Sequence, residues 1–272
     1  MNPMNDFILS LLMAAMAYSF ISIGIVLQKK GISWIGWKGI KDRAYYKNLI
    51  VWISGFLLMN LYGIPSAIAL KSLSPHHVSA FAGWGVVVLI FLSKILLKDV
   101  IFRSDYFYSL IIIAGIVMLT LSGNSVDSPE FSINILTLLY FLLPVFLFIL
   151  LLIIKISKKT INVLSAVVSG CTAGLMVISL KRLIGSEGYR VAEYPGSVYS
   201  YLYLFFALLS FVSLQISLKS GPVLVTGQIQ YSTIILYPLA GSLIVFSGKT
   251  DMLQMISIIL IVIGVVRILK NR

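Results

Sequence analysis

The sequence predicts an all-α polytopic membrane protein with about nine transmembrane helices. Hydrophobic residues make up 59% of the 272 residues and charged residues 11%, whereas soluble domains contain roughly 25% charged residues. The mean hydropathy is +1.02. The apolar residues form blocks of about 18–24 residues, and a helix of that length spans a hydrocarbon core of about 30 Å. This composition excludes a soluble enzyme and a soluble nucleic-acid-binding module.

The candidate spans lie between short charged segments. Their ranges are 7–28, 48–70, 77–97, 105–123, 132–154, 160–181, 198–218, 223–246 and 252–269. The first block is too long for the apolar region of a signal peptide and has no basic residue before it, so we expect a retained helix. The segment 29–47 mixes basic side chains with aromatic ones such as Trp34, Tyr45 and Tyr46. We expect it to lie on the cytoplasmic membrane surface, because its cations oppose spanning.

Lysine and arginine are unevenly distributed among the connecting segments. Most of the 21 basic residues follow the first, third, fifth, seventh and ninth spans, and most of the 9 acidic residues lie on the opposite side. Because short cytoplasmic segments carry the excess of basic residues, we expect an outside N-terminus and a cytoplasmic C-terminus. This asymmetry explains the net charge of +12 without a nucleic-acid partner. The expected partners are the lipid bilayer and a small-molecule or ion substrate, with a homodimer left open.

Short sequence matches indicate an internal repeat. Ala69-Leu70-Lys71-Ser72 at the end of the second span matches Ser217-Leu218-Lys219-Ser220 at the end of the seventh, and a proline follows each. Ala114-Gly115-Ile116-Val117 in the fourth span matches Ile263-Gly264-Val265-Val266 in the ninth. The predicted organisation is a first four-helix repeat at 1–123, a connector helix at 124–159, and a second four-helix repeat in the opposite orientation at 160–272. Inverted repeats are typical of secondary transporters; an unrepeated helix bundle is the alternative.

Three segments resemble the drug/metabolite transporter (DMT) superfamily. They are the run from Ser19 to Gly31, the segment Ala67-Ile68-Ala69-Leu70 with Pro75, and Leu96-Leu97-Lys98-Asp99 before a glycine-containing helix. The nine-helix layout and the Lys29-Lys30-Gly31 ending of the first span resemble the NIPA-type magnesium transporters more than the ten-helix EamA-type members. The resemblance implies a multi-pass carrier in the plasma membrane. NIPA-type proteins carry a glutamate in their second helix, however, and residues 48–70 contain no carboxylate.

Polar side chains within the spans are candidates for the substrate pathway. All nine acidic residues lie near predicted helix ends or in connecting segments, which favours a neutral, zwitterionic or anionic solute, or facilitated diffusion. Gln228 and Tyr231 are three residues apart and share a helix face, whereas Gln230 points elsewhere. Burying an amide without a partner costs roughly 2 kcal/mol or more. The further candidates, for which helix packing is the alternative role, are Trp84, Asn60, Gly83, Ser22 and Thr172.

The predicted function is transport of a small solute by alternating access, with two alternatives. One is a NIPA-like magnesium or divalent-cation transporter, whose metal-binding residues would be Asp99, Asp105 and Asp251. The other is a non-transporting structural or lipid-binding membrane protein. No G-x-S-x-G, H-E-x-x-H or phosphate-binding loop occurs in the sequence. We therefore expect neither an enzyme nor a cofactor.

Overall fold

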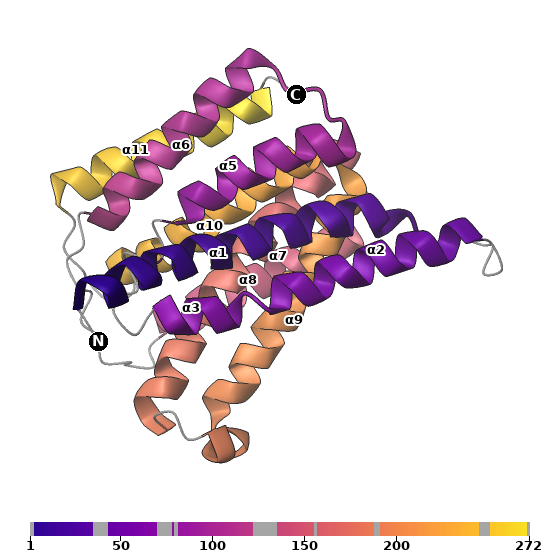
Figure 1. The fold of residues 1–272 in the computed structure, drawn as a ribbon. Coiled ribbons are helices and arrows are strands. Elements are labelled where there is room, and N and C mark those ends of the chain that lie inside the picture. The colour runs from indigo at the N-terminus through magenta and orange to yellow at the C-terminus, as the bar shows by residue number, and fades with distance from the viewer. Residues whose placement is uncertain are drawn as a thin grey trace. The chain divides into compact units, whose positions relative to one another are not determined.

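The computed structural model describes residues 3–34, 43–69, 78, 81–121, 135–154, 157–187, 191–244 and 251–270. Every regular element among these residues is a helix (Figure 1), which confirms the all-α prediction for this part of the chain. The elements are α1 (Pro3–Gly31), η1 (Ile32–Trp34), α2 (Arg43–Asn60), α3 (Gly63–Ala69), α5 (Ala82–Leu92), the π-helical η2 (Ser93–Leu97), α6 (Arg103–Leu121), α7 (Ile135–Ile153), α8 (Lys158–Glu187), η3 (Val191–Gly196), α9 (Val198–Ser220), α10 (Val223–Ile244) and α11 (Met252–Lys270).

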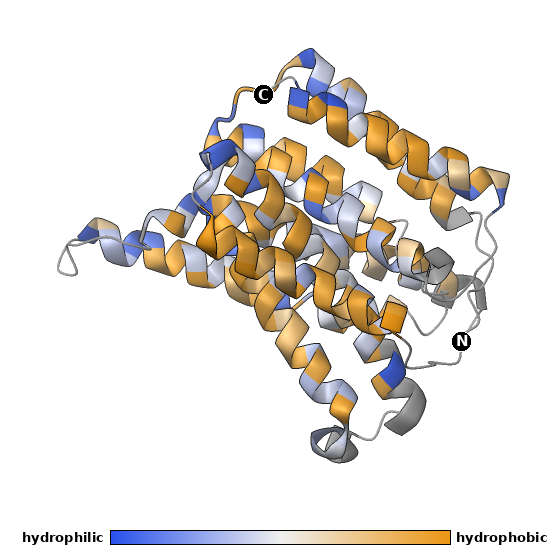
Figure 2. Cartoon of the chain, turned by 180° about the vertical axis from the view of Figure 1, so that it is seen from behind, coloured by the Kyte–Doolittle hydropathy of each residue, from blue (hydrophilic) through white to orange (hydrophobic). Residues whose placement is uncertain are grey.

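Six helical segments are long and apolar enough to cross a membrane. They are Phe7–Gly31, Arg43–Ser66, Ile135–Ile153, Lys158–Leu180, Val198–Ser220 and Met252–Lys270. Ala82–Leu97 is a shorter apolar helix. Apolar residues cover much of the helix lengths, and several helix ends are hydrophilic (Figure 2). These features are those of a polytopic helical membrane protein, and the total of nine spans stays a prediction.

The predicted second span is interrupted in the structure. Helix α2 ends at Asn60, and α3 begins at Gly63. Pro65 lies in the first turn of α3, where the missing N–H of proline is tolerated. A continuous helix would instead place the proline ring against the carbonyl of Leu61, four residues earlier. The predicted span over 48–70 therefore contains a break at residues 61–62, while Arg43–Ser66 is still one candidate membrane span.

The start of α2 also differs from the prediction. The helix begins at Arg43, five residues before the expected position 48, so Tyr45 and Tyr46 are helical. A surface segment over 29–47 is corrected accordingly: its first residues, Lys29 and Lys30, end α1. Basic and aromatic side chains at the end of a helix can extend towards the membrane surface, and the surface position of this segment stays a prediction. The predicted surface residues 35–42 lie outside the described residues.

The described helices divide into two compact units. Unit 1 comprises Met1–Asn124, Pro222–Gln228 and Thr250–Arg272, and unit 2 comprises Ser125–Gly221 and Ile229–Lys249. Helix α11 thus belongs to unit 1, and α10 contributes its first turns to unit 1 and the rest to unit 2. The units follow spatial contacts and do not coincide with the repeat boundaries at 123 and 160. The sequence repeat stays a prediction.

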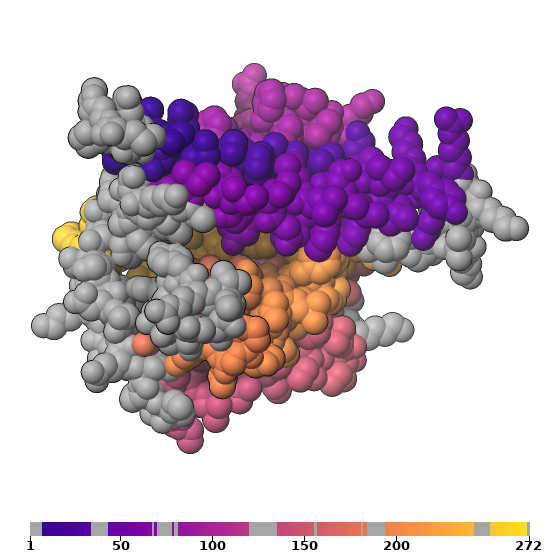
Figure 3. Space-filling view, turned by 60° about the horizontal axis from the view of Figure 1, so that its bottom comes forward, coloured from indigo at the N-terminus to yellow at the C-terminus, as the bar shows by residue number. Residues whose placement is uncertain are grey.

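In unit 1, helices α1 and α2 approach each other through glycines. A Cβ atom built on Gly24 would lie 2.7 Å from the Gly55 carbonyl oxygen, and one on Gly55 would lie 2.7 Å from the Gly24 carbonyl oxygen. A Cβ atom on Gly31 would likewise overlap the Asn48 carbonyl oxygen. The purple side chains of α2 lie directly against the indigo ones of α1 in Figure 3. Small residues allow this backbone approach, which drives helix association in lipid.

Helices α6 and α11, also in unit 1, cross with reciprocal glycine contacts. A Cβ atom on Gly115 of α6 would lie 3.0 Å from the Ser257 carbonyl oxygen of α11. One on Gly264 of α11 would lie 3.1 Å from the Tyr108 carbonyl oxygen of α6. Each glycine thus meets the carbonyl that lies two helical turns before the other glycine. A late residue on each helix faces an early residue on the other, so the helices are antiparallel and their crossing has local two-fold symmetry.

We predict that Gly24→Val disrupts the contact between α1 and α2. The two added methyl groups and Cβ would force the backbones apart, and overpacking of this kind costs about 1–3 kcal/mol in the free energy of unfolding. Unfolding titration of the purified protein in mixed micelles measures this loss. Gly63→Ala is the matched control, because a Cβ atom there meets nothing within 4 Å. Equal losses in the two variants would contradict the glycine contact.

Candidate functional site

Helix α10 brings two glutamine side chains into the protein interior. Its first ten residues, 223–232, are all buried. Gln228 is 1% exposed and Gln230 is 8% exposed. Large polar side chains rarely occupy such positions without hydrogen-bonding partners. The hydrogen-bonding partners of each glutamine therefore show which amide atoms are used within the protein.

In unit 1, Gln228 contacts helix α6 through Ser109. The Gln228 Nε2 atom donates a short hydrogen bond to the Ser109 Oγ atom. Ser109 is also buried, and its hydroxyl donates to the Asp105 carbonyl oxygen at 2.6 Å, one turn earlier in the same helix. The Gln228 Oε1 atom is buried and has no hydrogen-bond partner among the described residues.

In unit 2, Gln230 contacts a row of polar side chains between α8 and α9. Its Nε2 atom donates to the Ser169 Oγ atom at 3.1 Å. Ser169 and Ser210 donate reciprocally to each other's carbonyl oxygens, at 3.0 and 2.9 Å. Two turns away, Asn162 Nδ2 donates to the Ser217 carbonyl oxygen at 2.9 Å, and the Ser217 hydroxyl donates to the Asn162 carbonyl oxygen at 2.8 Å. We call these four residues of α8 and α9 the polar seam.

A tyrosine pair joins α7 to α10 within unit 2. The rings of Tyr140 and Tyr237 stack with centroids 4.6 Å apart and planes 10° apart. The Tyr140 hydroxyl donates to the Tyr237 carbonyl oxygen at 3.1 Å, and the Tyr237 hydroxyl donates to the Tyr140 carbonyl oxygen at 2.6 Å. Gly241 leaves room for the Tyr140 ring, which a Cβ atom there would overlap. The reciprocal bonds satisfy both phenol groups inside the helix bundle.

The predicted pathway residues on α10 lie in different surroundings. Gln228 bonds to α6 in unit 1, and Gln230 bonds to α8 in unit 2. Tyr231 is buried, at the start of the unit 2 part of α10. The structure agrees that Gln228 and Gln230 have different neighbours. That Gln228 and Tyr231 line a common pathway stays a prediction.

Three other pathway candidates donate to backbone carbonyl oxygens. The Ser22 hydroxyl of α1 donates to the Gly85 carbonyl oxygen of α5 at 2.7 Å. Thr172 donates to Val168 in its own helix at 2.7 Å, and exposed Asn60 donates to Phe56 in its own helix at 2.7 Å. Ser22 therefore joins two helices, whereas Thr172 and Asn60 bond back onto their own helices.

The two candidates of α5 differ in exposure. Trp84 is 47% exposed, and its Nε1 atom donates to the Ser19 Oγ atom at 3.0 Å. Gly83 is buried, and a Cβ atom there would lie 3.1 Å from the Ile113 Cγ2 atom of α6. Gly83 thus allows α5 and α6 to pack closely within unit 1, and Trp84 leaves much of its ring accessible.

The acidic residues of the divalent-cation alternative lie at element ends. Asp105 Oδ2 accepts a hydrogen bond from the Phe102 backbone N–H at 3.0 Å at the start of α6. Asp251 Oδ1 accepts one from the Gln254 backbone N–H at 2.8 Å at the start of α11. Asp99 follows the π-helical turn η2. Across the described ranges, no three His, Cys, Asp or Glu residues group so that they could hold a metal ion.

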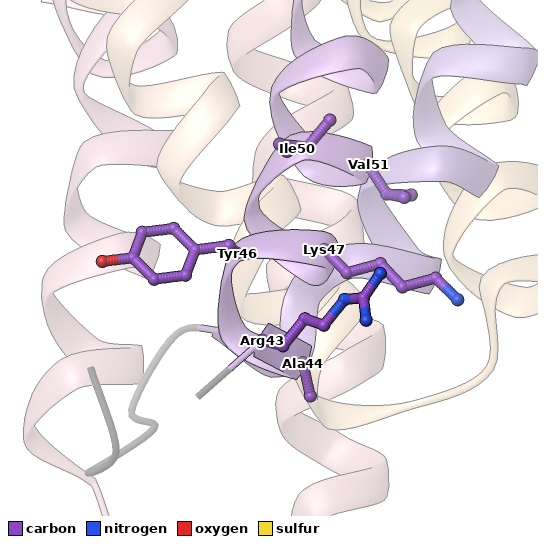
Figure 4. Close-up of a pocket in the computed structure, with 6 residues that line it drawn as sticks. All are labelled: Arg43, Ala44, Tyr46, Lys47, Ile50 and Val51. Carbon is purple, nitrogen blue, oxygen red and sulfur yellow. The ribbon is translucent and has the colours of Figure 1, made fainter. Parts of the chain in front are cut away.

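An open hollow of about 700 Å³ lies beside the first turns of α2. Its lining residues are Arg43, Ala44, Tyr46, Lys47, Ile50 and Val51. The close-up shows that Tyr46 extends to one side of the helix, while Arg43 and Lys47 extend to the other (Figure 4). Polar groups that do not converge cannot hold a solute in a fixed orientation. The hollow is therefore a weaker candidate than the buried glutamines.

Sequence reasoning did not identify the partners of the two glutamines. Ser109 is one small polar residue in an apolar helix, and nothing local marks it as a partner of Gln228. The polar seam had a detectable signal, because Asn162 and Ser169 are seven residues apart in α8 and Ser210 and Ser217 are seven apart in α9. This heptad spacing places each pair on one helix face.

Comparison of the chain with family models, with curated proteins and with solved structures gave no match. The resemblance to drug/metabolite transporters therefore rests on the sequence segments alone. Geometry defines one candidate site in each unit: Gln228 with Ser109 in unit 1, and Gln230 with the polar seam in unit 2.

We predict that Asn162→Ala destabilises the protein by about 1–2 kcal/mol. The change removes a buried side chain that bonds across two helices, and such bonds contribute up to about 1.7 kcal/mol in membrane proteins. Asn60→Ala is the matched control, because the Asn60 amide is exposed and bonds within its own helix. We expect it to change the free energy of unfolding by less than about 0.5 kcal/mol. Unfolding titration in mixed micelles compares the two, and similar losses would contradict a stabilising polar seam.

Proposed function

We propose that this protein is an integral membrane transporter of the drug/metabolite type, which moves a small solute by alternating access. The observation that carries the proposal is the burial of the Gln228 and Gln230 amides in a protein made of apolar helices. An amide can form up to four hydrogen bonds, and each of these shows one through its nitrogen. Burying such a group with incomplete bonding lowers stability. Binding of a polar solute explains why the helix carries both.

The crossing of α6 and α11 supports the predicted inverted repeat, which is a common feature of secondary transporters. Two helices related by a two-fold axis make reciprocal contacts, as Gly115 and Gly264 do here. These two glycines are also the residues that the sequence match between the fourth and ninth spans aligns. The antiparallel crossing agrees with a second repeat that is inverted relative to the first.

The acidic residues favour a solute other than a divalent cation. Mg²⁺ prefers carboxylate oxygens and keeps several of its waters. Asp105 and Asp251 each use a carboxylate oxygen to bond the backbone at the first turn of a helix. Such bonds stabilise helix starts. They give these carboxylates a structural role that needs no metal.

We predict that Gln228→Leu lowers solute uptake into proteoliposomes at least tenfold. The solute is first selected by thermal stabilisation of the purified protein with Mg²⁺, other divalent ions, amino acids, nucleosides, sugar phosphates and lipophilic cations. Gln254→Leu is the matched control, since Gln254 is also a buried glutamine but lies at the start of α11. We expect this control to retain uptake. Stabilisation by Mg²⁺ that is lost in Asp105→Asn and kept in Gln228→Leu would establish the divalent-cation alternative instead.

We predict that single introduced cysteines report an outside N-terminus and a cytoplasmic C-terminus. The chain has one cysteine, Cys171, and it is buried in α8. Val198 and Ser157 are exposed and lie at the starts of α9 and α8. In intact cells, a membrane-impermeant maleimide should label Val198→Cys and should label Ser157→Cys after permeabilisation only. The reverse pattern would contradict the orientation that the basic residues predict.

A further inference from the structure

We propose that the start of α2 binds an anionic phospholipid, with the phosphate against Arg43 and Lys47 and the acyl chains along the exposed apolar side chains of the same helix. The inference concerns unit 1 alone and does not depend on the proposed transport function. It begins from the open hollow of about 700 Å³ beside the first turns of α2. A small solute needs converging polar groups to be held there, whereas a phospholipid is already oriented by the bilayer around it.

Two cations of the hollow share one side of the helix. Arg43 and Lys47 are four residues apart, a spacing that brings side chains together on a helix surface, and both are exposed and extend to the same side (Figure 4). The guanidinium group of arginine matches phosphate oxygens through paired N–H donors. The segment 29–47 contains six basic residues and one acidic residue, Asp42, which lies outside the described residues. A phosphate at this position would therefore meet a net positive charge.

An apolar stripe continues from these cations along the same face of α2. Its members Ile50, Ile53 and Leu57 are 63%, 40% and 57% exposed, and Ile50 also lines the hollow. Their spacing of three and four residues keeps them on one helix face. At 1.5 Å per residue, the helix rises about 15 Å from Lys47 to Leu57, which is about half of a hydrocarbon core of roughly 30 Å. The stripe thus has the length of one leaflet and suits the acyl chains of a lipid whose phosphate lies at Lys47.

Neighbouring residues of unit 1 agree with a position at the membrane surface. The end of α1 lies beside this part of α2, because a Cβ atom on Gly31 would overlap the Asn48 carbonyl oxygen and Asn48 Nδ2 donates to the Ser33 Oγ atom at 2.9 Å. Exposed Lys30 therefore adds a third cation at the same end. Tyr46 is 52% exposed, and tyrosines are enriched where a membrane meets water. Clustered basic residues at this depth attract anionic headgroups.

The inference is tested by lipid titration of the purified full chain in detergent micelles. The probes are phosphatidylglycerol and phosphatidylcholine with identical acyl chains, and native mass spectrometry measures the bound lipid. The double variant Arg43→Gln with Lys47→Gln removes two cations at exposed positions, so we expect it to fold normally. We expect it to weaken phosphatidylglycerol binding roughly tenfold or more and to change phosphatidylcholine binding by less than about twofold.

The matched control is the double variant Lys158→Gln with Lys159→Gln. It removes the same charge from two exposed lysines at the start of α8, and adjacent residues of a helix do not face each other. We expect it to keep phosphatidylglycerol binding. Equal losses in the two double variants would show general attraction by positive charge and overturn the inference.

Two other outcomes also overturn the lipid site. Glycerol 3-phosphate that binds as tightly as phosphatidylglycerol would show a site for a soluble phosphate. If Arg43→Gln with Lys47→Gln leaves lipid binding unchanged but alters the mass of the protein in light scattering, the start of α2 contacts a second copy of the chain instead. The transport proposal is unaffected by either result, because its own test uses Gln228 and solute uptake.

Discussion

A bilayer core offers no water, so each buried polar group of this protein needs a partner within the chain. Most of the described polar side chains meet this requirement by donating to backbone carbonyl oxygens. Ser22 bonds to a neighbouring helix, the polar seam bonds reciprocally, and the Tyr140 and Tyr237 hydroxyls bond across α7 and α10. The amide oxygens of Gln228 and Gln230 depart from this pattern, since they are acceptors and every backbone N–H inside a helix is already bonded. The Ser213 and Ser232 hydroxyl oxygens also lack a hydrogen-bond partner among the described residues.

The α1–α2 pair of unit 1 and the α8–α9 pair of unit 2 associate by different means. Unit 1 uses glycines, which let α1 meet α2 and α6 meet α11 at backbone distance. Unit 2 uses the polar seam, in which serine and asparagine hold α8 against α9. In the predicted repeat, the hairpin of α1 and α2 corresponds to that of α8 and α9. Under that prediction, the same position in the fold uses glycine contacts in one repeat and side-chain hydrogen bonds in the other.

The sequence predicted the helices well because their length and apolar composition are set by the bilayer itself. It was less accurate about boundaries within a span: α2 and α3 are separated near Pro65, and α2 begins at Arg43, five residues before the expected start. It singled out Gln228 and Gln230 because three large polar residues in one apolar helix are conspicuous. It could not supply Ser109 or Ser169 as their partners, since contacts between distant segments leave no local pattern, apart from the heptad spacing in α8 and α9.

Neutral amides are well suited to a carrier, which must release its solute as well as bind it. A buried charge binds strongly but is costly to desolvate, and leaving it without a partner after release costs several kcal/mol. Leaving a buried amide oxygen without a partner costs only about 1–3 kcal/mol. Ser109 and Ser169 each accept a hydrogen bond from a glutamine nitrogen, and each hydroxyl also lies within hydrogen-bond distance of a backbone carbonyl oxygen. Under the proposed transport function, these uncharged groups favour moderate affinity for a polar solute and its ready release on the other side of the membrane.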